Sequence, residues 1–468
     1  MRLLKGFCTF IFVLAMALAM SSVARADAVT DWNAIAIQII ANAPCPNAPC
    51  PNPPNPPPSH PGATSFLDSA IVQAAVYDAV ESITGRFRPY AVHVPGASGS
   101  TDAAVAKAAH DVLLSRFPAS QFPAIATFLD AAYHKYLTDH GLAETDPGVA
   151  VGAAAAAGII ALRANDGSFP NCSLTPAPPL CHFVGSTDIG VWRPTPSFLP
   201  GPPAPNSPML APWLSIVTPF TLTSNSQFRA VPPPSLTSKR YTADYNEVKS
   251  LGARFNSGRT AEQTEIGLFW YSNYLVLWFH ALRDIAEKHV HNIDDSARLF
   301  ALASLAMGDA VLTAWDTKYH YAFDEKTSWR PITAIRNGDL DGNPNTVADP
   351  NWEPLQNNPN YPEYTSGANN VTGAVTRMLA LFFGTDEMTF TVATTNHPPA
   401  TTTTRTYNRF SDAAEDVFHA RIYVGIHFRY SDLLGRRQGR HVAQWVFSHF
   451  LRSVDDDDHD DHDGADDE

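Results

Sequence analysis

Residues 315–336 read WDTKYHYAFDEKTSWRPITAIR and place the cations Lys318 and Arg330, with Lys326 and Arg336, among closely spaced aromatic residues. Two further segments with a similar mixture of polar and apolar residues follow, YPEYTSGA at 361–368 and RIYVGIHFR at 421–429. Apolar residues at helical spacing surround all three segments. The order of these segments, and the helices expected around them, decide our interpretation of the fold.

The chain alternates helical patterns with Pro-rich loops. Because no strand–helix rhythm and no repeat of fixed period is present, we predict an all-α fold, a helical bundle of two packed halves with long Pro-rich loops. The expected helices span Trp32–Ala41, Phe66–Ile83, Thr101–Phe117, Ala119–Leu137, Asp146–Asn165, Thr260–Val290, Asp294–Tyr321, Ser366–Phe383, Ser411–Ile422 and Leu433–Arg452.

Three stretches lack helical periodicity. Pro44–Gly62 is expected to be an extended loop, because proline cannot continue a helix. Asp166–Pro234 predicts a long irregular excursion with a functional or covering role. Thr389–Thr406 is rich in threonine and predicts a short strand or a loop.

The N-terminus has the pattern of a secretory signal peptide. Basic residues precede an apolar run from Phe7 to Met20, and Ala-Arg-Ala follows at 24–26. The run is shorter than the roughly 20 apolar residues of a membrane-spanning helix, and we expect no later span. We therefore predict a signal peptide over residues 1–26 and an exported protein, periplasmic or secreted.

The cysteines agree with export. Cys8 lies in the signal peptide, and the other four form two close pairs, Cys45/Cys50 and Cys172/Cys181. An even number in an exported chain predicts disulfides. Four cysteines allow three connectivities, and proximity along the chain favours the two local bridges.

The net charge of −14 arises mostly at the C-terminus. Residues 455–468, DDDDHDDHDGADDE, contain ten acidic residues, and without them the charge is −4. This tail is expected to be disordered, because it has no apolar surface to bury. The remainder has no basic stripe, so no nucleic-acid partner is predicted.

Together the three segments resemble the signature of the vanadium-dependent haloperoxidase and type-2 phosphatidic acid phosphatase superfamily, in its bacterial exported branch. That signature runs Lys-x6-Arg-Pro, then Pro-Ser-Gly-His, then Ser-Arg-x5-His. The resemblance extends to Ile71–Ile83. It implies one helical domain over residues 27–454, with the oxyanion pocket in a core at about 294–452.

The resemblance also implies a bound tetrahedral oxyanion. Vanadate is the implied cofactor in the haloperoxidase branch, and phosphate would take its place in a phosphatase. His427 would be the axial ligand of vanadium or the nucleophile toward phosphorus. The implied vanadate- or phosphate-binding residues are Lys318, Arg330, Ser366, Gly367 and Arg421.

The residue types suit this chemistry. Arginine pairs two oxygens of an oxyanion at once, and the helix expected from Ser366 offers free N–H groups at its start. Arg421 and His427 lie about 240° apart on an ideal helix. Both can face one anion only if the helix is interrupted, and Gly425 is placed to allow this.

The lysine departs from the signature. Lys318 lies twelve residues before Arg330 rather than seven, and Asp324–Ser328 resembles a five-residue insertion. Lys326 is the rival, because it lies four residues before Arg330 and would share a helix face with it. We favour Lys318, on condition that the insertion forms a loop.

The second departure is Ala368, which occupies the position of the signature histidine. The family uses that histidine as its general acid–base group, and such a group contributes about 10²–10⁴-fold to the rate. Alanine has no proton to transfer. The candidates to replace it are His320, His397 and His441.

Three functions follow, in order of preference. The first is an exported vanadium-dependent haloperoxidase-like enzyme that oxidises halide with hydrogen peroxide at a His427-bound vanadate. The second is a periplasmic acid phosphatase with a phosphohistidine intermediate in the same pocket. The third is a degenerate oxyanion-binding protein without catalysis, because Ala368 and the shifted lysine both depart from the signature. The halide, the organic substrate and the oligomeric state stay open.

Overall fold

The computed structural model describes residues 27–41, 60, 62–172, 174, 180–201, 204–324 and 328–457. Helix accounts for 56% of the structure. Within the described ranges the single sheet is a two-stranded hairpin. The all-α prediction is therefore confirmed. The expected signal peptide, the Cys45/Cys50 pair and residues 458–468 of the acidic tail lie outside the described ranges.

The N-terminal half is a group of helices around α2, which is buried along nearly all its length. Helices α3, α5 and α9 pack against it. Asp146 caps α5 by accepting a hydrogen bond from the backbone of Gly148. Gly152 lets α5 lie close to α3, because a Cβ there would lie 2.3 Å from the carbonyl oxygen of Ala104. The elements are α1 (Ala28–Ala41), η1 (Gly62–Thr64), α2 (Ser65–Thr84), α3 (Thr101–Arg116), α4 (Pro123–Asp139) and α5 (Pro147–Arg163).

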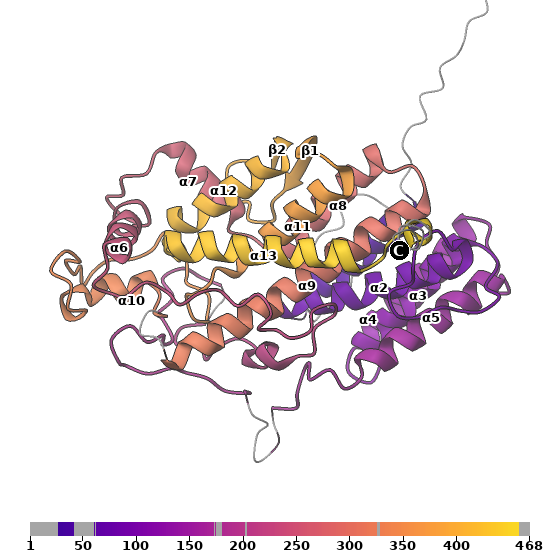
Figure 1. Cartoon of the computed structure of the whole chain (residues 1–468), viewed down its shortest axis with the longest axis horizontal. Helices are drawn as coiled ribbons and strands as arrows, with labels where there is room; N and C mark the ends of the chain where they lie inside the picture. Colours follow the sequence, from indigo (N-terminus) through magenta and orange to yellow (C-terminus); the bar gives the residue numbers. More distant parts are fainter. Residues whose placement is uncertain are drawn as a thin grey trace, which may run out of the picture.

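The C-terminal half contains the three segments quoted at the outset. Its elements are η2 (Pro212–Ile216), α6 (Lys239–Leu251), α7 (Ala261–Trp270), α8 (Tyr274–His289), α9 (Ile293–Asp324), α10 (Pro331–Arg336), η3 (Gly338–Leu340), α11 (Gly367–Phe383), β1 (Glu387–Ala393), β2 (Thr404–Arg409), α12 (Phe410–Tyr423), α13 (Arg429–His449) and η4 (Val454–Asp457). Figure 1 shows α2 to α5 gathered at one end of the molecule and α6 and α10 at the other.

Helix α9 connects the two halves. It packs against α2 on one side and against α11 and α13 on the other, and it runs through the middle of the molecule in Figure 1. By length and composition α9 could cross a membrane, contrary to our expectation that no later run is apolar enough. However, 94% of its apolar window is buried within the protein, as in the core helix of a folded domain.

Several boundaries differ from the sequence predictions. The single helix expected over Thr260–Val290 is wrong: the chain breaks between α7 and α8, where the Asn273 side chain caps α8 by accepting from Leu275. Helices α6 and α10 were not anticipated, because α6 is polar and α10 has only 6 residues. The Thr-rich stretch forms the antiparallel hairpin of β1 and β2.

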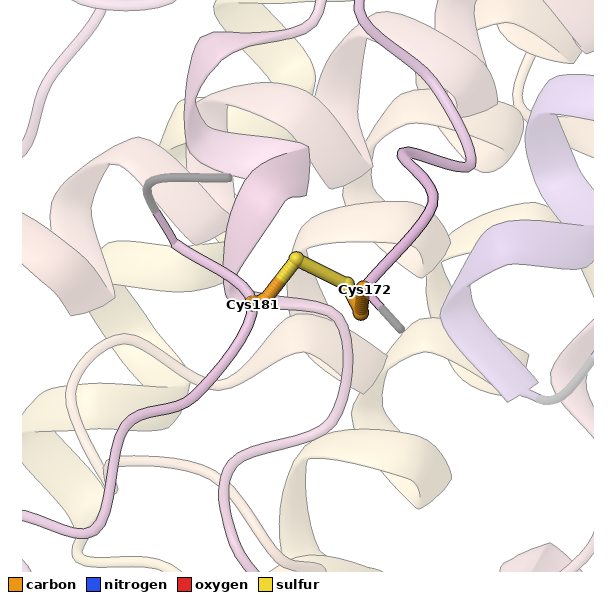
Figure 2. The surroundings of a disulfide bond; sticks show 2 residues. All are labelled: Cys172 and Cys181. Atoms are coloured by element: carbon orange, nitrogen blue, oxygen red, sulfur yellow. A yellow bond between two sulfur atoms is a disulfide. The ribbon is translucent and has the colours of Figure 1, made fainter. Parts of the chain in front are cut away.

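The described part of the irregular excursion contacts the first segment and the chain next to the second. The backbone of Gly190 accepts hydrogen bonds from Ser328 and Trp329, and Leu210 donates to the carbonyl of Asn360. Cys172 and Cys181 form a disulfide within this excursion, as Figure 2 shows. The functional or covering role of this excursion stays a prediction.

Helices α11 and α13 approach each other very closely. A Cβ added at Gly439 of α13 would lie 1.8 Å from the carbonyl oxygen of Asn370 of α11. At the N-terminal end of the same contact, Ser366 donates a backbone hydrogen bond to the carbonyl of Ser431 at 3.2 Å. Glycine at this contact therefore sets the position of the first turn of α11 relative to that of α13.

We predict that Gly439→Ala lowers the stability of the folded protein. Because the neighbouring atom is backbone, the helices must separate, and overpacking of this kind costs about 1–3 kcal/mol. Urea unfolding followed by circular dichroism measures the loss. Ser448→Ala, at an exposed position of the same helix, is the control and should stay within about 0.5 kcal/mol of wild type. Equal stability of the two variants would contradict the packing argument.

Candidate functional site

The three segments converge where α9, α11 and the α12–α13 connection meet. All six residues predicted to form the site are buried there or at its edge. Lys318 comes from α9, Arg330 precedes α10, Ser366 and Gly367 begin α11, Arg421 lies in the last turn of α12, and His427 lies between α12 and α13.

Lys318 belongs to this pocket. Its side chain is fully buried, and Nζ donates hydrogen bonds to the backbone carbonyls of Pro362 at 2.7 Å and Glu363 at 3.1 Å. The ammonium also lies 4.9 Å from the centre of the Tyr361 ring. Lys326 lies outside the described ranges. The choice of Lys318 over Lys326 therefore stays a prediction.

Arg330 directs its guanidinium at His427. Nε donates to the carbonyl of Tyr361 at 2.9 Å, and Nη1 donates to the carbonyl of Ile426 at 2.8 Å. Nη1 also lies 3.2 Å from Nε2 of His427. Because a guanidinium can only donate hydrogen bonds, Nε2 of His427 must be the acceptor.

The other ring nitrogen of His427 is held by Glu363. Nδ1 lies 2.8 Å from Oε1 of Glu363, which also accepts from the backbone N–H of Phe428 at 3.0 Å. Since Nε2 accepts, Nδ1 carries the ring proton and donates a hydrogen bond to the Glu363 carboxyl group. The geometry therefore fixes one neutral tautomer, with the Nε2 lone pair facing the Arg330 guanidinium.

Burial strengthens this arrangement. Burial and the nearby Arg330 hold the pKa of His427 well below its usual range, which favours the neutral ring. Burial also raises the pKa of Glu363 to about 7, although Arg330 opposes this. A neutral imidazole with a free lone pair is the form that binds a metal or attacks phosphorus.

Arg421 and His427 face the same region because the helix is interrupted between them, as the sequence predicted. Helix α12 ends at Tyr423, α13 begins at Arg429, and Gly425 adopts a φ of +80°. A side chain at this φ would be strained, and its Cβ would lie 2.5 Å from the carbonyl oxygen of Gly252.

The start of α11 is open toward a ligand. Ser366 is the N-cap of this helix, yet its hydroxyl makes no capping hydrogen bond. A Cβ at Gly367 would meet no protein atom within 4 Å except the Trp315 ring at 3.5 Å. The first N–H groups of a helix and its dipole attract anions, so this space suits an oxyanion.

The pocket holds an excess of positive charge. Burial and the Arg330 charge lower the pKa of Lys318 well below its usual range, and burial lowers the pKa of Arg330 to about 10. Arg421 lies close enough to disfavour the charged form of both. Arg330 Nη2 and Arg421 Nε have no hydrogen-bond partner among the described residues. An anion with several oxygens could accept hydrogen bonds from these donors.

The three histidines considered as replacements for the missing one are exposed. His320 stacks edge-on with the Tyr321 ring, and Nδ1 of His397 lies 2.5 Å from the carbonyl oxygen of Ala400. His441 lies beside the ring of Phe228. Each therefore contacts residues other than the six site residues, and the buried surroundings of the pocket do not extend to them.

Sequence reasoning missed two buried carboxyl groups. Glu363 stands in the quoted segment YPEYTSGA, but nothing in that segment marks it as the partner of His427. Asp432 lies five residues after His427, in the first turn of α13, and accepts a hydrogen bond from Asn369 at 2.8 Å. Both side chains have 0% exposure. The charge of an acidic residue ordinarily keeps it at the surface, so sequence alone favours the wrong environment for both.

No group of three or more His, Cys, Asp or Glu side chains in the described ranges is arranged to hold a metal ion. The pocket instead presents cationic donors and one histidine nitrogen. This donor set suits a metal that arrives as an oxyanion, whose oxygens accept hydrogen bonds while one position accepts a nitrogen ligand.

Known proteins that resemble this chain include vanadium-dependent haloperoxidases. Residues 298–456 match the family model described as the VCPO second helical-bundle domain. Vanadium chloroperoxidase from Curvularia inaequalis is 28% identical over 217 residues, covering 39% of this chain and 34% of that protein. The match thus spans about a third of the length of this curated relative.

Solved structures share the fold over most of the chain. The first bacterial vanadium-dependent iodoperoxidase superposes with a TM-score of 0.70 at 22% identity, covering 91% of this chain and 97% of that one. An apo bacterial vanadium-dependent chloroperoxidase gives a TM-score of 0.66 at 18% identity, covering 85% and 95%. At sequence identities this low, the structural similarity shows a shared fold alone.

We predict that the carbonyl oxygen of a glutamine can replace Glu363 in orienting His427. Glu363→Gln and Glu363→Ala both remove the charge, but only glutamine can accept from Nδ1. Orthovanadate should therefore bind Glu363→Gln more tightly than Glu363→Ala, by roughly the 10–100-fold typical of groups that orient a metal ligand. Isothermal titration calorimetry measures both affinities. Equal affinities would show that Glu363 does not orient the ring.

A second pair of variants tests the choice of lysine. Lys318→Met removes a buried charged donor, and such hydrogen bonds contribute about 1.5–3 kcal/mol, or roughly 10- to 150-fold in Kd for orthovanadate. Lys326→Met should leave the affinity unchanged. The reverse result, measured by the same titration, would assign the anion to Lys326.

Proposed function

Because this chain belongs to the superfamily of the vanadium haloperoxidases, we propose that it is an exported, vanadate-dependent enzyme that oxidises halide with hydrogen peroxide. The family supports peroxidase chemistry in general. The cofactor, the halide oxidation and the site residues rest on the pocket geometry.

One observation carries the proposal: His427 presents the Nε2 lone pair to a buried cationic pocket. Glu363 holds Nδ1 at 2.8 Å, and Nη1 of Arg330 lies 3.2 Å from Nε2. An incoming oxyanion can accept the Arg330 N–H in place of the ring. Nε2 is then free to bind the central atom, and the ring does not need to lose a proton.

The residues present fit a vanadate ion. One guanidinium nitrogen of Arg330 and one of Arg421 have no partner among the described residues. Outside its own helix and chain neighbours, a Cβ at Gly367 would have only the Trp315 ring within 4 Å. Ser366 keeps its hydroxyl free of a capping role. Lys318, Arg330, Ser366, Gly367 and Arg421 would hold the oxygens, and His427 would be the nitrogen ligand.

When bound, vanadate supplies Lewis-acid activation of hydrogen peroxide toward attack by halide. The protein supplies the surroundings. The cations neutralise the anion's charge, while Tyr361 covers both Lys318 and Arg330 with its ring at 4.9 Å from each cationic group. A buried pocket of this kind strengthens each electrostatic contact, because little water screens it.

Export is supported by two features of the chain. The N-terminal sequence has the pattern of a signal peptide, and Cys172 and Cys181 form a disulfide in the described structure. Stable disulfides are typical of oxidising compartments outside the cytoplasm. We infer that the mature protein acts in the periplasm or outside the cell.

The test is reconstitution of the purified chain with orthovanadate, followed by bromination of a dye with bromide and hydrogen peroxide. We expect turnover in the wild type and only the rate of free vanadate in His427→Ala, because the nitrogen ligand is lost. Phosphate release from a generic monoester is measured in parallel. Monoester hydrolysis without bromination would assign the pocket to a phosphatase, and tight vanadate binding with neither activity would identify a non-catalytic oxyanion-binding protein.

A further inference from the structure

Asp432 is a buried carboxyl group that none of the roles above uses. It lies in the first turn of α13, and its side chain is fully buried. Oδ1 accepts a hydrogen bond from Nδ2 of Asn369 at 2.8 Å, whereas Oδ2 has no hydrogen-bond partner among the described residues. The Ser366 hydroxyl lies beside the carboxyl.

These contacts suit a neutral acid better than a carboxylate. No ion pair holds Asp432 within the described ranges, and a buried carboxylate without one is strongly destabilised. Burial therefore raises the pKa of Asp432 well above its usual range, although Ser366 favours the charged form. A neutral carboxylic acid has one O–H to donate, and Oδ2 is the atom left free to carry it.

The neighbouring charges act in both directions. Cations of the pocket favour ionisation of Asp432, while the acidic groups oppose it. The groups that interact with it are Lys318 on α9, Arg330 before α10, Glu363 before α11, Arg421 on α12, Tyr274 on α8 and Arg429 on α13.

Asp432 also lies next to the position of the missing histidine. Asn369, which binds its Oδ1, directly follows Ala368, and Ser366 begins the same turn of α11. The close contact of α11 with α13 brings this turn against the first turn of α13. The oxyanion pocket, the first turn of α11 and Asp432 therefore lie next to one another.

The proposed reaction consumes a proton. Oxidation of a halide follows X⁻ + H₂O₂ + H⁺ → HOX + H₂O. A bond forms between the halogen and one peroxide oxygen, the O–O bond breaks, and the departing oxygen leaves as water after it takes up a proton. Ala368 cannot provide that proton.

We propose that Asp432 holds a proton beside the bound oxyanion and donates it to the departing oxygen, in place of the histidine that Ala368 lacks. This role rests on the function proposed above. The O–H at Oδ2 donates its hydrogen bond to the oxyanion and then transfers the proton. The resulting carboxylate regains a proton from solvent before the next turnover.

The variant Asp432→Asn distinguishes proton transfer by this side chain from its hydrogen bonds. The amide can accept from Asn369 and donate to the anion, but it cannot transfer a proton. With bromide and peroxide, turnover of the vanadate-loaded variant should fall by roughly 10²–10⁴-fold, while orthovanadate still binds. The double variant with Ala368→His should recover part of the lost rate. Undiminished turnover in Asp432→Asn would overturn the proposal.

A second readout does not depend on activity. Orthophosphate is titrated calorimetrically into the wild type and Asp432→Asn across a range of pH. The Kd of the wild type divided by that of the variant cancels the titration of the anion and of all other groups. This ratio should be near one at acid pH and rise at alkaline pH, because ionised Asp432 repels the anion. A ratio that does not change with pH would overturn the assignment, whatever the turnover.

The two proposals fail in different ways. A wild type that shows no halide oxidation, together with a pH-dependent ratio, would overturn the function and leave the proton on Asp432. If Asp432→Asn does not fold, the infrared difference spectrum of Glu363→Gln with and without orthophosphate makes the same test. A carboxylic-acid band that shifts on binding supports the proposal, and the lack of such a band counts against it.

Discussion

Burial of three cationic side chains within reach of one another is the constraint on which this site depends. Lys318, Arg330 and Arg421 each lose hydration. Arg330 and Arg421 disfavour the charge of Lys318, and Arg421 disfavours the charge of Arg330. Backbone carbonyls offset part of this cost: those of Pro362 and Glu363 hold Lys318, while those of Tyr361 and Ile426 hold Arg330. A bound oxyanion would relieve the remaining repulsion.

Two buried carboxyl groups border this pocket and have different surroundings. Glu363 accepts from the His427 ring and from a backbone N–H, and Arg330 opposes the rise in its pKa. Asp432 has an amide and a hydroxyl beside it and no ion pair in the described part of the chain. Environments that differ in this way separate the properties of chemically similar groups, which allows one to orient a ring and the other to carry a proton.

The sequence predicted the long helices because their apolar periodicity extends over many turns, as in Phe66–Ile83 and Ser366–Phe383. It missed the break between α7 and α8, since Trp, Tyr and Leu continue across it and only the Asn273 cap marks the new start. The six residues predicted to form the site could be named because the motif keeps their types and order, and the structure brings them together in one buried region. Glu363 and Asp432 were missed because their partners, Phe428 and Asn369, come from other segments.

Helix α9 has a consequence for the order in which the chain folds. Helix α2 of the N-terminal half finds a main packing surface on α9, which emerges from the ribosome only after some two hundred further residues. Until then the apolar surface of α2 that packs against α9 in the folded protein stays uncovered by it. The N-terminal half therefore cannot complete its core until α9 has been synthesised. Until that point the growing chain exposes apolar surface of the kind that chaperones recognise.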